Sequence, residues 1–424
     1  MVNYLYRVIE VYQKLILGEE LSPGEIWEAG RLLGTPTRKV DALLSRYSDV
    51  LGRLIEERCS GVGGYRICIY TWSKWSFKRY FPAALDAGGT IIAYKDDKPD
   101  LVSYPLHRAF DVDVKGVSVP EDQPIITPRI DGWQVNLYWD PILGKPVYST
   151  RFVLHNMFFE GKTLRVHDYG VITNPVVKAA DYISDRLGLY EAAKTLEGWT
   201  LTFMMKSEKP ALAVKRPPRP WDGEKTELIL IAARKPEGYL LDPEDIARLS
   251  TELGVRDIYS FSLKKENIIV WAENQVEYPS IFLWFLDRGD REHPEIYEVK
   301  SIYYNDYIKA SYNNDAKSLI VLLTSGIKDI VDAVKLAIGE ALVDETSEAL
   351  GILHDALKNV DPERIRQVLE ATGINRRMVK SAIRAISEGK SGRALRIIAA
   401  SSVEGFKLED APLILKHLAR TLRE

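Results

Sequence analysis

A long central region with period-two hydrophobic alternation, set between two regions of helical periodicity, constrains the fold of this chain most. The alternation runs from Tyr65 to about Tyr307 with helical interludes. Before it, Leu5, Val8 and Ile9 recur at helical spacing, and the chain is helical again from Ser311. The sequence therefore predicts an α+β fold with a central antiparallel sheet. The expected domains are a helical segment over residues 1–58, a central domain over 59–310 and a helical domain over 311–424.

Composition places the chain among globular proteins. It has 424 residues, of which 46% are hydrophobic and 28% charged, enough for two or three domains with their own cores. The formal net charge is -3, so any nucleic-acid binding must come from local basic patches. No apolar run is long enough to span a bilayer, and we expect no membrane partner.

Cysteine usage bears on the cellular setting. Cys59 and Cys68 are too few for a disulfide framework or a four-thiolate zinc site, which favours a reducing cytoplasm. We expect a cytoplasmic protein without a metal centre. Abundant Glu, Arg, Lys and Ile, with few Cys, Met and Gln, is a thermophile-like usage.

The N-terminal region offers a weak nucleic-acid signal. Residues 26–54 contain two periodic segments around a Gly-Thr-Pro-Thr turn, a pattern compatible with a helix-turn-helix whose Arg38, Lys39 and Arg46 contact phosphate. Two packed helices with solvated charges explain the same pattern, and we favour that simpler interpretation.

Aromatic and basic residues interleave directly after the first expected strand. Such a mixture can stack unpaired bases and meet the phosphate backbone, or it can bury its aromatics with the basic side chains in water. Both interpretations stay open. The candidate RNA-binding residues here are Trp72, Lys74, Trp75, Lys78 and Arg79.

The most informative motif is Arg129-Ile130-Asp131-Gly132, which precedes an alternating strand over residues 133–139. Together with its neighbours it resembles the signature of the ATP-dependent RNA ligases of the phage single-strand-repair type, within the covalent nucleotidyltransferases. Their signature is Lys-x-Asp-Gly. The resemblance implies a nucleotidyltransferase-like, ATP-grasp-like ligase fold for the central domain.

Flanking motifs follow the order of that family over about residues 59–310. Residues 103–111 resemble the segment before the lysine motif, Lys145 to Arg151 the strand ending in Thr-Arg, residues 276–287 the Glu-Gly strand, and residues 296–301 the terminal Lys-x-Lys strand. The residues implied to bind nucleotide or phosphate are Arg129, Asp131, Gly132, Arg151, Glu277 and Lys300.

Four positions depart from the family pattern. The upstream arginine is missing at Gly88, Arg129 replaces the lysine that would carry the adenylate, Met204 replaces an acid, and Glu298 replaces the first lysine of the last motif. A guanidinium stays protonated and is a poor nucleophile, yet it clamps phosphate well. We expect Glu298 to repel phosphate and Met204 to remove a metal ligand, so adenylyl transfer by the usual route is not expected.

The C-terminal helical domain is locally basic. In the ligases that the chain resembles, such an appendage recognises the particular RNA, and the expected RNA-binding residues here are Arg376, Arg377, Lys380 and Arg384. A charge-rich bundle without a partner is the alternative.

Taken together, the sequence predicts a catalytically inactive, ligase-derived protein that binds structured RNA or an RNA-protein assembly, with tRNA, rRNA or the ribosome as possible partners and no cofactor expected. One alternative is an active, divergent RNA ligase or adenylyltransferase that needs ATP and Mg²⁺. Another is a ribosome-associated inhibitory or scaffolding factor. The sequence does not indicate an oligomeric state.

Overall fold

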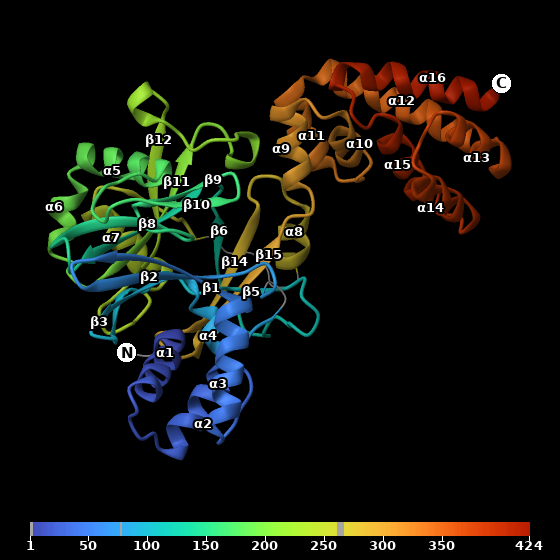
Figure 1. The fold of residues 1–424 in the computed structure, drawn as a ribbon. Coiled ribbons are helices and arrows are strands. Elements are labelled where there is room, and N and C mark those ends of the chain that lie inside the picture. The colour runs from blue at the N-terminus through green and yellow to red at the C-terminus, as the bar shows by residue number, and fades with distance from the viewer. Residues whose placement is uncertain (1–2, 77–78, 261–266) are drawn as a thin grey trace. The chain divides into compact units, whose positions relative to one another are not determined.

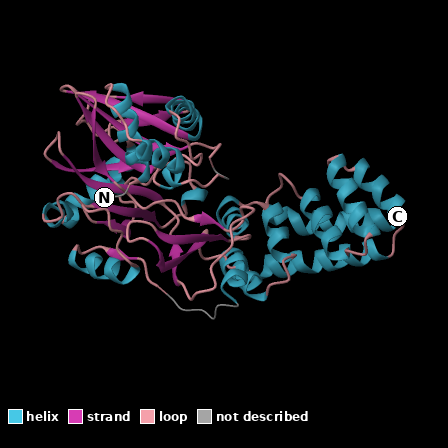
Figure 2. Ribbon diagram, turned by 90° about the horizontal axis from the view of Figure 1, so that it is seen from below, coloured by secondary structure: helices cyan, strands magenta, loops and turns pink. Residues whose placement is uncertain are grey.

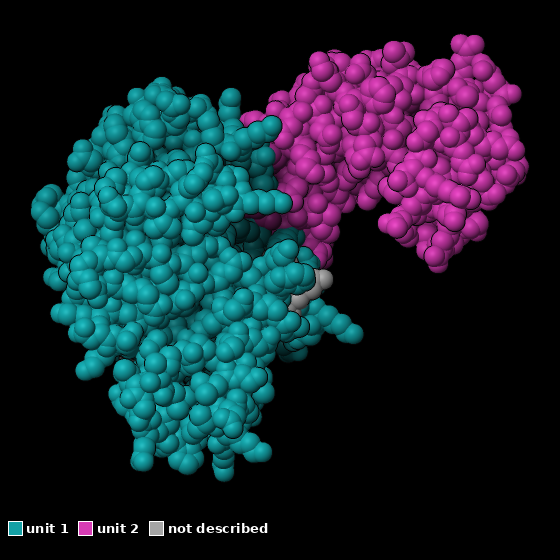
Figure 3. Space-filling model, in the orientation of Figure 1, with its two compact units in different colours: residues 1–265, 280–300 teal, residues 266–279, 301–424 magenta. Residues whose placement is uncertain are grey.

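The computed structural model describes residues 3–76, 79–260 and 267–424, which fall into two compact units (Figure 3). Unit 1 contains residues 1–265 and 280–300, and unit 2 contains residues 266–279 and 301–424. The structure is a mixed α+β fold, as expected, and the described strands all belong to unit 1 (Figure 2). The division into three domains at residues 58 and 310 stays a prediction.

Unit 1 begins with α1 (Tyr4–Ile16), α2 (Pro23–Leu32), α3 (Val40–Asp49) and the π-helical turn η1 (Val50–Leu54) (Figure 1). Helices α2 and α3 form the N-terminal hairpin. Ser22 caps α2 through a capping box with Glu25, as the Ser-Pro-Gly-Glu sequence indicates. Arg46 donates two hydrogen bonds to the Leu33 carbonyl, at 3.1 and 2.9 Å, and pairs with Asp49. This cation therefore ties the hairpin together.

The strands described in unit 1 form three larger sheets and a two-stranded ribbon. The first sheet has the order β1 (Ile55–Val62), β2 (Tyr65–Trp72), β3 (Gly88–Lys95) and β4 (Lys98–Ser103). The second has the order β13 (Arg256–Asp257), β12 (Thr226–Arg234), β11 (Thr200–Ser207), β7 (Trp133–Asp140) and β8 (Lys145–Thr150). The third has the order β5 (Phe110–Asp111), β15 (Pro294–Lys300), β14 (Ser280–Gly289) and β6 (Ile125–Arg129). The ribbon pairs β9 (Met157–Glu160) with β10 (Thr163–Val166).

The expectation of one antiparallel sheet is thus only partly correct. Pairing is antiparallel except at two sheet edges, where β13 runs parallel to β12 and β5 runs parallel to β15. The helices of this unit after η1 are α4 (Pro82–Leu85), α5 (Pro175–Leu187), α6 (Leu189–Lys194) and α7 (Pro243–Glu252), with 3-10 turns η2 (Ala211–Ala213) and η3 (Pro220–Asp222). Apolar residues of α5, α6 and α7 pack on the second sheet, which makes β11 a buried central strand.

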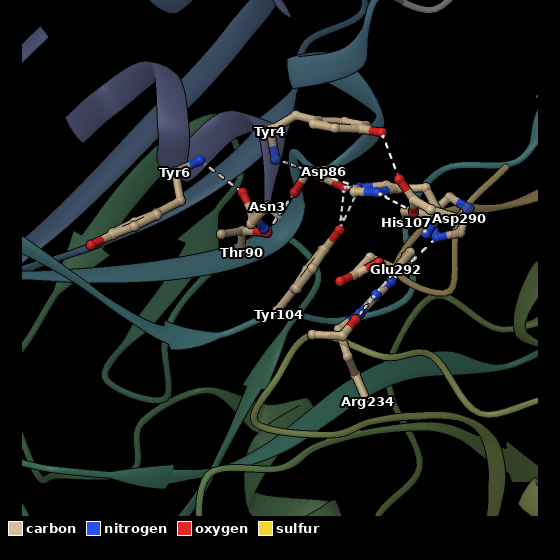
Figure 4. Close-up of polar contacts among 12 residues, drawn as sticks. Asn3, Tyr4, Tyr6, Asp86, Thr90, Tyr104, His107, Arg234, Asp290 and Glu292 are labelled. Carbon is tan, nitrogen blue, oxygen red and sulfur yellow. Dashed lines mark hydrogen bonds and ion pairs between the residues drawn. The ribbon is translucent and has the colours of Figure 1, made fainter. Parts of the chain in front are cut away.

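A buried polar network ties the N-terminus to the β14–β15 hairpin within unit 1 (Figure 4). The Asp86 carboxylate accepts hydrogen bonds from the Tyr4 backbone N–H at 2.6 Å and from the Tyr104 hydroxyl at 2.9 Å, and it lies 2.9 Å from His293 Nε2. Arg234 lies over the Tyr104 ring, 3.6 Å from its centroid. Charges buried here are therefore met by partners from distant parts of the chain.

Unit 2 is helical where the structure describes it. Its helices are α8 (Ile268–Asn274), α9 (Tyr304–Asn313), α10 (Ala316–Leu323), α11 (Lys328–Ile338), α12 (Glu340–Lys358), α13 (Pro362–Ala371), α14 (Arg376–Ser387), α15 (Ser391–Ser402) and α16 (Ala411–Arg423), with the 3-10 turn η5 (Leu408–Asp410). Apolar residues of α10, α12–α16 form one core cluster.

Two expectations about cellular setting meet different outcomes. Cys59 and Cys68 face each other across β1 and β2 and form a disulfide, a pairing that the sequence did not lead us to expect. The cytoplasmic location stays a prediction. Among the described residues, no helix combines the length and the apolar character needed to traverse a bilayer.

Candidate functional site

A cavity of about 590 Å³ opens inside unit 1 where its sheets converge. Each of the three larger sheets and the ribbon supplies part of the wall, so the cavity depends on the whole unit. Representative lining residues are Trp72 and Gly88 from the first sheet, Gln134, Met204 and Ile231 from the second, Arg129, Phe282 and Glu298 from the third, and Phe158 and Phe159 from the ribbon.

The Arg-Ile-Asp-Gly motif connects β6 to β7 at the cavity wall. Arg129 is the last residue of β6, and Gly132 lines the cavity at the turn. A Cβ at Gly132, whose φ is +156°, would lie 2.4 Å from the Met205 carbonyl oxygen, so this turn requires glycine. Asp131 is not among the lining residues, and its carboxylate accepts the Ala211 N–H at 2.8 Å.

Arg129 and Glu298 form an ion pair across the third sheet. Their Nη1 and Oε1 atoms are 2.9 Å apart, and the same oxygen accepts the Ser280 hydroxyl at 2.7 Å. Ser280 lies opposite Arg129 on one side and Lys300 on the other, so strand register brings these groups together. The expectation that Glu298 would repel phosphate needs correction, because Arg129 offsets its charge.

Lys300 is also held by a carboxylate. Its ammonium group contacts Asp111 at the parallel edge between β5 and β15. Asp111 and Glu298 are the carboxylates that line the cavity in the described part of the chain. Each of them forms an ion pair with a lining cation. Divalent ions need carboxylate oxygens that face the ligand, so this pair does not fit Mg²⁺.

Arg151 is the exception among the cavity cations. It follows β8, and its guanidinium carbon lies 3.7 Å from the centroid of the Trp72 ring. Within the described residues it makes no hydrogen bond or ion pair, and its Nε is buried without an acceptor. Burial lowers the pKa of Arg151 to about 9, and the neighbouring Arg129 charge lowers it as well. An anion in the cavity would relieve both effects.

Trp72 occupies the space that an upstream arginine would need. A Cβ at Gly88 would come within 2.9 Å of the Trp72 ring and 3.3 Å of the Leu106 carbonyl oxygen. A longer side chain at residue 88 therefore cannot coexist with the indole in this position. The position of the Trp72 ring therefore requires glycine at residue 88 and excludes the arginine of the ligase pattern.

The lining favours an anionic ligand with aromatic rings. Four lining cations, Arg108, Arg129, Arg151 and Lys300, face two lining carboxylates, which leaves two positive charges in excess. Aromatic side chains supply flat apolar surface for stacking. Those that line the cavity are Trp72, Tyr80, Trp133, Phe152, Phe158, Phe159 and Phe282.

Arg108 lines the cavity but was not predicted as a site residue, although residues 103–111 resemble a segment of the ligase pattern. Arg108 is buried, donates a hydrogen bond to the Ser76 carbonyl at 2.9 Å, and lies 4.5 Å from the centroid of the Tyr80 ring. Its partners lie on a separate stretch of chain. The Tyr-Pro-Leu-His-Arg segment carries the signal, but sequence alone does not show which ring the guanidinium meets.

Other expected site residues lie outside the cavity wall. Glu277 is exposed in a bend before β14 and belongs to unit 2. Lys74, Trp75 and Arg79 are exposed in the segment after β2, where the Lys74 ammonium lies 4.9 Å from the centroid of the Trp75 ring. Lys78 lies outside the described residues.

The basic residues expected to bind RNA in the C-terminal domain share one helix. Arg376, Arg377, Lys380 and Arg384 are exposed on α14, while Val379, Ala382 and Ala385 of the same helix are buried. Arg384 pairs with Glu388 at 2.7 Å. In the described chain, the group of His, Cys, Asp or Glu close enough to share a metal ion is Glu57, Cys59 and Cys68, whose thiols are bonded to each other.

Comparisons with known proteins give a distant likeness. No protein-family model matches the sequence, and no curated protein matches it significantly. Similar solved structures include two forms of an archaeal ATP-dependent RNA ligase. Form 1 is 13% identical over 68% of each chain with a TM-score of 0.39, and form 2 is 13% identical over 72% of this chain and 73% of that one with a TM-score of 0.40.

A Naegleria gruberi RNA ligase solved with PPi is 10% identical, over 59% of this chain and 97% of that one, with a TM-score of 0.29. At such identities and TM-scores the likeness says nothing about activity. Function has to be inferred from the cavity itself.

Proposed function

We propose that this protein binds single-stranded RNA without covalent chemistry, and that the cavity of unit 1 holds a phosphorylated 5' end. Arg151 carries this proposal, because it is a mostly buried cation beside an aromatic ring with no protein acceptor. A phosphate would supply acceptors in a bidentate geometry that suits a guanidinium. The neighbouring base would stack on the aromatic lining.

Arg129 supports a non-covalent role. Its guanidinium cannot shed a proton to become a nucleophile, and its charge is already shared with Glu298. Arg129 therefore holds Glu298 in the cavity wall, while Arg151 binds the phosphate of the ligand. The resemblance of the motif order to RNA ligases supports RNA as the polymer, and RNA contacts by Trp72, Lys74, Trp75 and Arg79 belong to the same proposal.

Photo-crosslinking tests this assignment. A 5'-phosphorylated RNA 12-mer with 4-thiouridine as its first nucleotide, irradiated with the native protein, should crosslink to peptides containing Trp72, Phe152 or Phe159. The same RNA with a 5' hydroxyl should crosslink more weakly. Crosslinks confined to peptides far from the cavity, with equal yield for both RNAs, would contradict the proposal.

The alternative is an active ligase that uses another residue or a pre-adenylated substrate. Naegleria gruberi RNA ligase, one of the similar structures, has been solved with ATP and Mn and with PPi, which are ligands of that protein. Incubation with α-labelled ATP and Mg²⁺ tests for a ligase that adenylates itself, and incubation with a pre-adenylated RNA tests for one that does not. A label that stays on the denatured protein, or joining of the pre-adenylated RNA, would establish the ligase, and the absence of both together with RNA crosslinking in the cavity supports non-covalent binding. Association with the ribosome stays a prediction.

A further inference from the structure

We infer that α13 and α14 form a helix-turn-helix whose second helix enters the major groove of duplex DNA. The inference rests on unit 2 alone and does not depend on the proposed RNA cavity. The two helices are separated by residues 372–375, and a turn of three to four residues, often containing glycine, is typical of this motif. Gly373 has a φ of +79°, a left-handed conformation that favours glycine.

The turn is fixed at both ends by hydrogen bonds. Gly373 N–H donates to the Glu370 carbonyl at 3.2 Å, and Ile374 N–H donates to the Leu369 carbonyl at 3.3 Å, which closes α13. Asn375 caps α14 by accepting the Arg377 N–H at 2.9 Å. The start of α14 is therefore held in a defined place relative to α13.

Apolar contacts hold the two helices as one body. Ile365, Val368 and Leu369 of α13 and Val379 and Ala382 of α14 belong to the same buried cluster. That cluster also contains residues of α12, α15 and α16, so the pair rests on a larger helical support. One face of α14 is thereby committed to the core.

The opposite face of α14 carries positive charge only. At about 100° per residue, Arg376, Lys380, Arg384 and Arg377 fall within a sector of about 100°, opposite the buried positions. The helix sequence contains no Asp or Glu. Arg376, Arg377 and Lys380 make no ion pair within the described residues, whereas Arg384 pairs with Glu388. Three of the four cations are thus available to a ligand.

The dimensions of an α-helix favour duplex DNA over duplex RNA as the partner of this face. An α-helix with side chains is about 10–12 Å across, and the B-form major groove is about 12 Å wide. Arg376 and Arg384 are separated by about 12 Å along the axis, which spans three to four base pairs at about 3.4 Å each. The major groove of A-form RNA is too deep and narrow to admit a helix.

The N-terminal hairpin makes a useful contrast. In this hairpin, Arg46 donates a hydrogen bond to the Leu33 carbonyl and pairs with Asp49, so this cation is not available to bind phosphate. In α14 the corresponding basic side chains point away from the core. The two hairpins have similar sequence patterns, and their contacts give them different roles.

Fluorescence anisotropy with the full chain tests the inference. The probe is a mixed-sequence 20-base-pair DNA duplex with 5' hydroxyl ends, compared with an RNA duplex of the same sequence. We expect the native protein to bind the DNA at least about tenfold tighter than the RNA. The Arg376→Ala/Arg377→Ala/Lys380→Ala variant should lose at least about tenfold in DNA affinity, and the slope of log K against log salt should become shallower by about 2.7.

A matched variant controls for net charge. Lys309→Ala/Lys328→Ala/Lys358→Ala removes three exposed cations from α9, α11 and α12 and should bind DNA as the native protein does. Equal DNA affinity of the α14 variant and the native protein would overturn the inference. So would equal losses in both variants, or tighter binding of the RNA duplex than of the DNA duplex. An Arg151→Met variant should bind this DNA normally, which separates the outcome from that of the RNA cavity.

Discussion

Arg234, which is buried, and Arg151, which is partly buried, are two arginines of the same unit with different surroundings. Arg234 is 1% exposed, lies over Tyr104, and donates to the carbonyls of Gly238 and Glu292, each at 2.6 Å. Arg151 lies over Trp72 in a similar way but has no acceptor in the described chain. The Nε of each arginine is buried without an acceptor, but the fold gives Arg234 two carbonyl acceptors at Nη1 and gives Arg151 none in the described chain.

This difference separates a structural charge from a functional one. Burying a cation without an acceptor costs free energy that the fold has to offset elsewhere. The carbonyl partners of Arg234 Nη1 offset most of this cost, whereas Arg151 would gain acceptors only with an anion bound. The same substitution is therefore expected to have very different effects on stability at the two positions.

Removal of Arg234 should have the largest effect. Arg234→Met leaves two carbonyl oxygens and His107 Nδ1 without their donor, and we expect the free energy of unfolding to fall by about 3 kcal/mol or more. Urea unfolding measures it. Arg151→Met, the matched change, should alter stability by about 1 kcal/mol or less. A larger loss for Arg151 than for Arg234 would reverse the assignment.

Arg151 should matter for the ligand instead. Arg151→Met removes a charge-assisted contact, so affinity for 5'-phosphorylated single-stranded RNA should fall about 10- to 100-fold. Arg151→Lys keeps the positive charge but loses the bidentate geometry of the guanidinium, so its affinity should lie between those of Arg151→Met and the native protein. Anisotropy titrations of the three proteins check this. Unchanged affinity in Arg151→Met would place the phosphate elsewhere.

The network around Arg234 predicts a pH effect on stability. Burial, and then the Arg234 charge, hold the pKa of His107 well below its usual value. The unfolded chain therefore binds a proton that the folded chain rejects, so stability is lost as pH falls below about 6.5. Between pH 6.5 and 5 the loss should reach about 2 kcal/mol.

Urea unfolding at pH 7 and pH 5 measures this dependence, and His107→Gln should flatten it by the same amount. The groups facing His107 are the Arg234 guanidinium, the Pro294 carbonyl, which lies 3.0 Å from Nε2, and the His293 ring at 5.5 Å between centroids. An equal pH dependence in the variant would assign the effect to other groups.

The smallest expected effect concerns Arg129 and Glu298. Because the Arg129 side chain is 41% exposed, solvent screens the pair, and a double-mutant cycle with Arg129→Met and Glu298→Gln should give a coupling energy of about 1 kcal/mol or less. Unfolding of the four proteins measures it. A coupling energy above about 2 kcal/mol would contradict the screening of this ion pair by solvent.

Sequence patterns predicted the local structure better than the site. The expected α+β fold was confirmed, with strands in the period-two region and helices on either side of it. The ion pair of Arg129 with Glu298 joins positions 169 residues apart, and the Cys59–Cys68 bond depends on strand register. Periodicity predicts which residues form a strand but not which residues of two strands lie opposite each other, so neither pairing was predicted.

The site residues divide along the same line. Arg129, Gly132, Arg151 and Lys300 were chosen from motif order and do line the cavity, whereas Asp131 and Glu277 do not. Motif order places a residue on a strand or a turn, but the direction of its side chain depends on what packs against it. Arg151 illustrates this, because the sequence does not show that its guanidinium lies against Trp72 without a hydrogen-bond acceptor.

Affinity for the 5' phosphate tests the central claim most directly. The measurement is a titration of the native protein with one single-stranded RNA 12-mer, prepared with a 5' phosphate and with a 5' hydroxyl, at the same salt concentration. The account predicts at least about tenfold tighter binding of the phosphorylated RNA, because Arg151 gains the acceptor that the protein does not provide. Equal affinity for the two RNAs would contradict it.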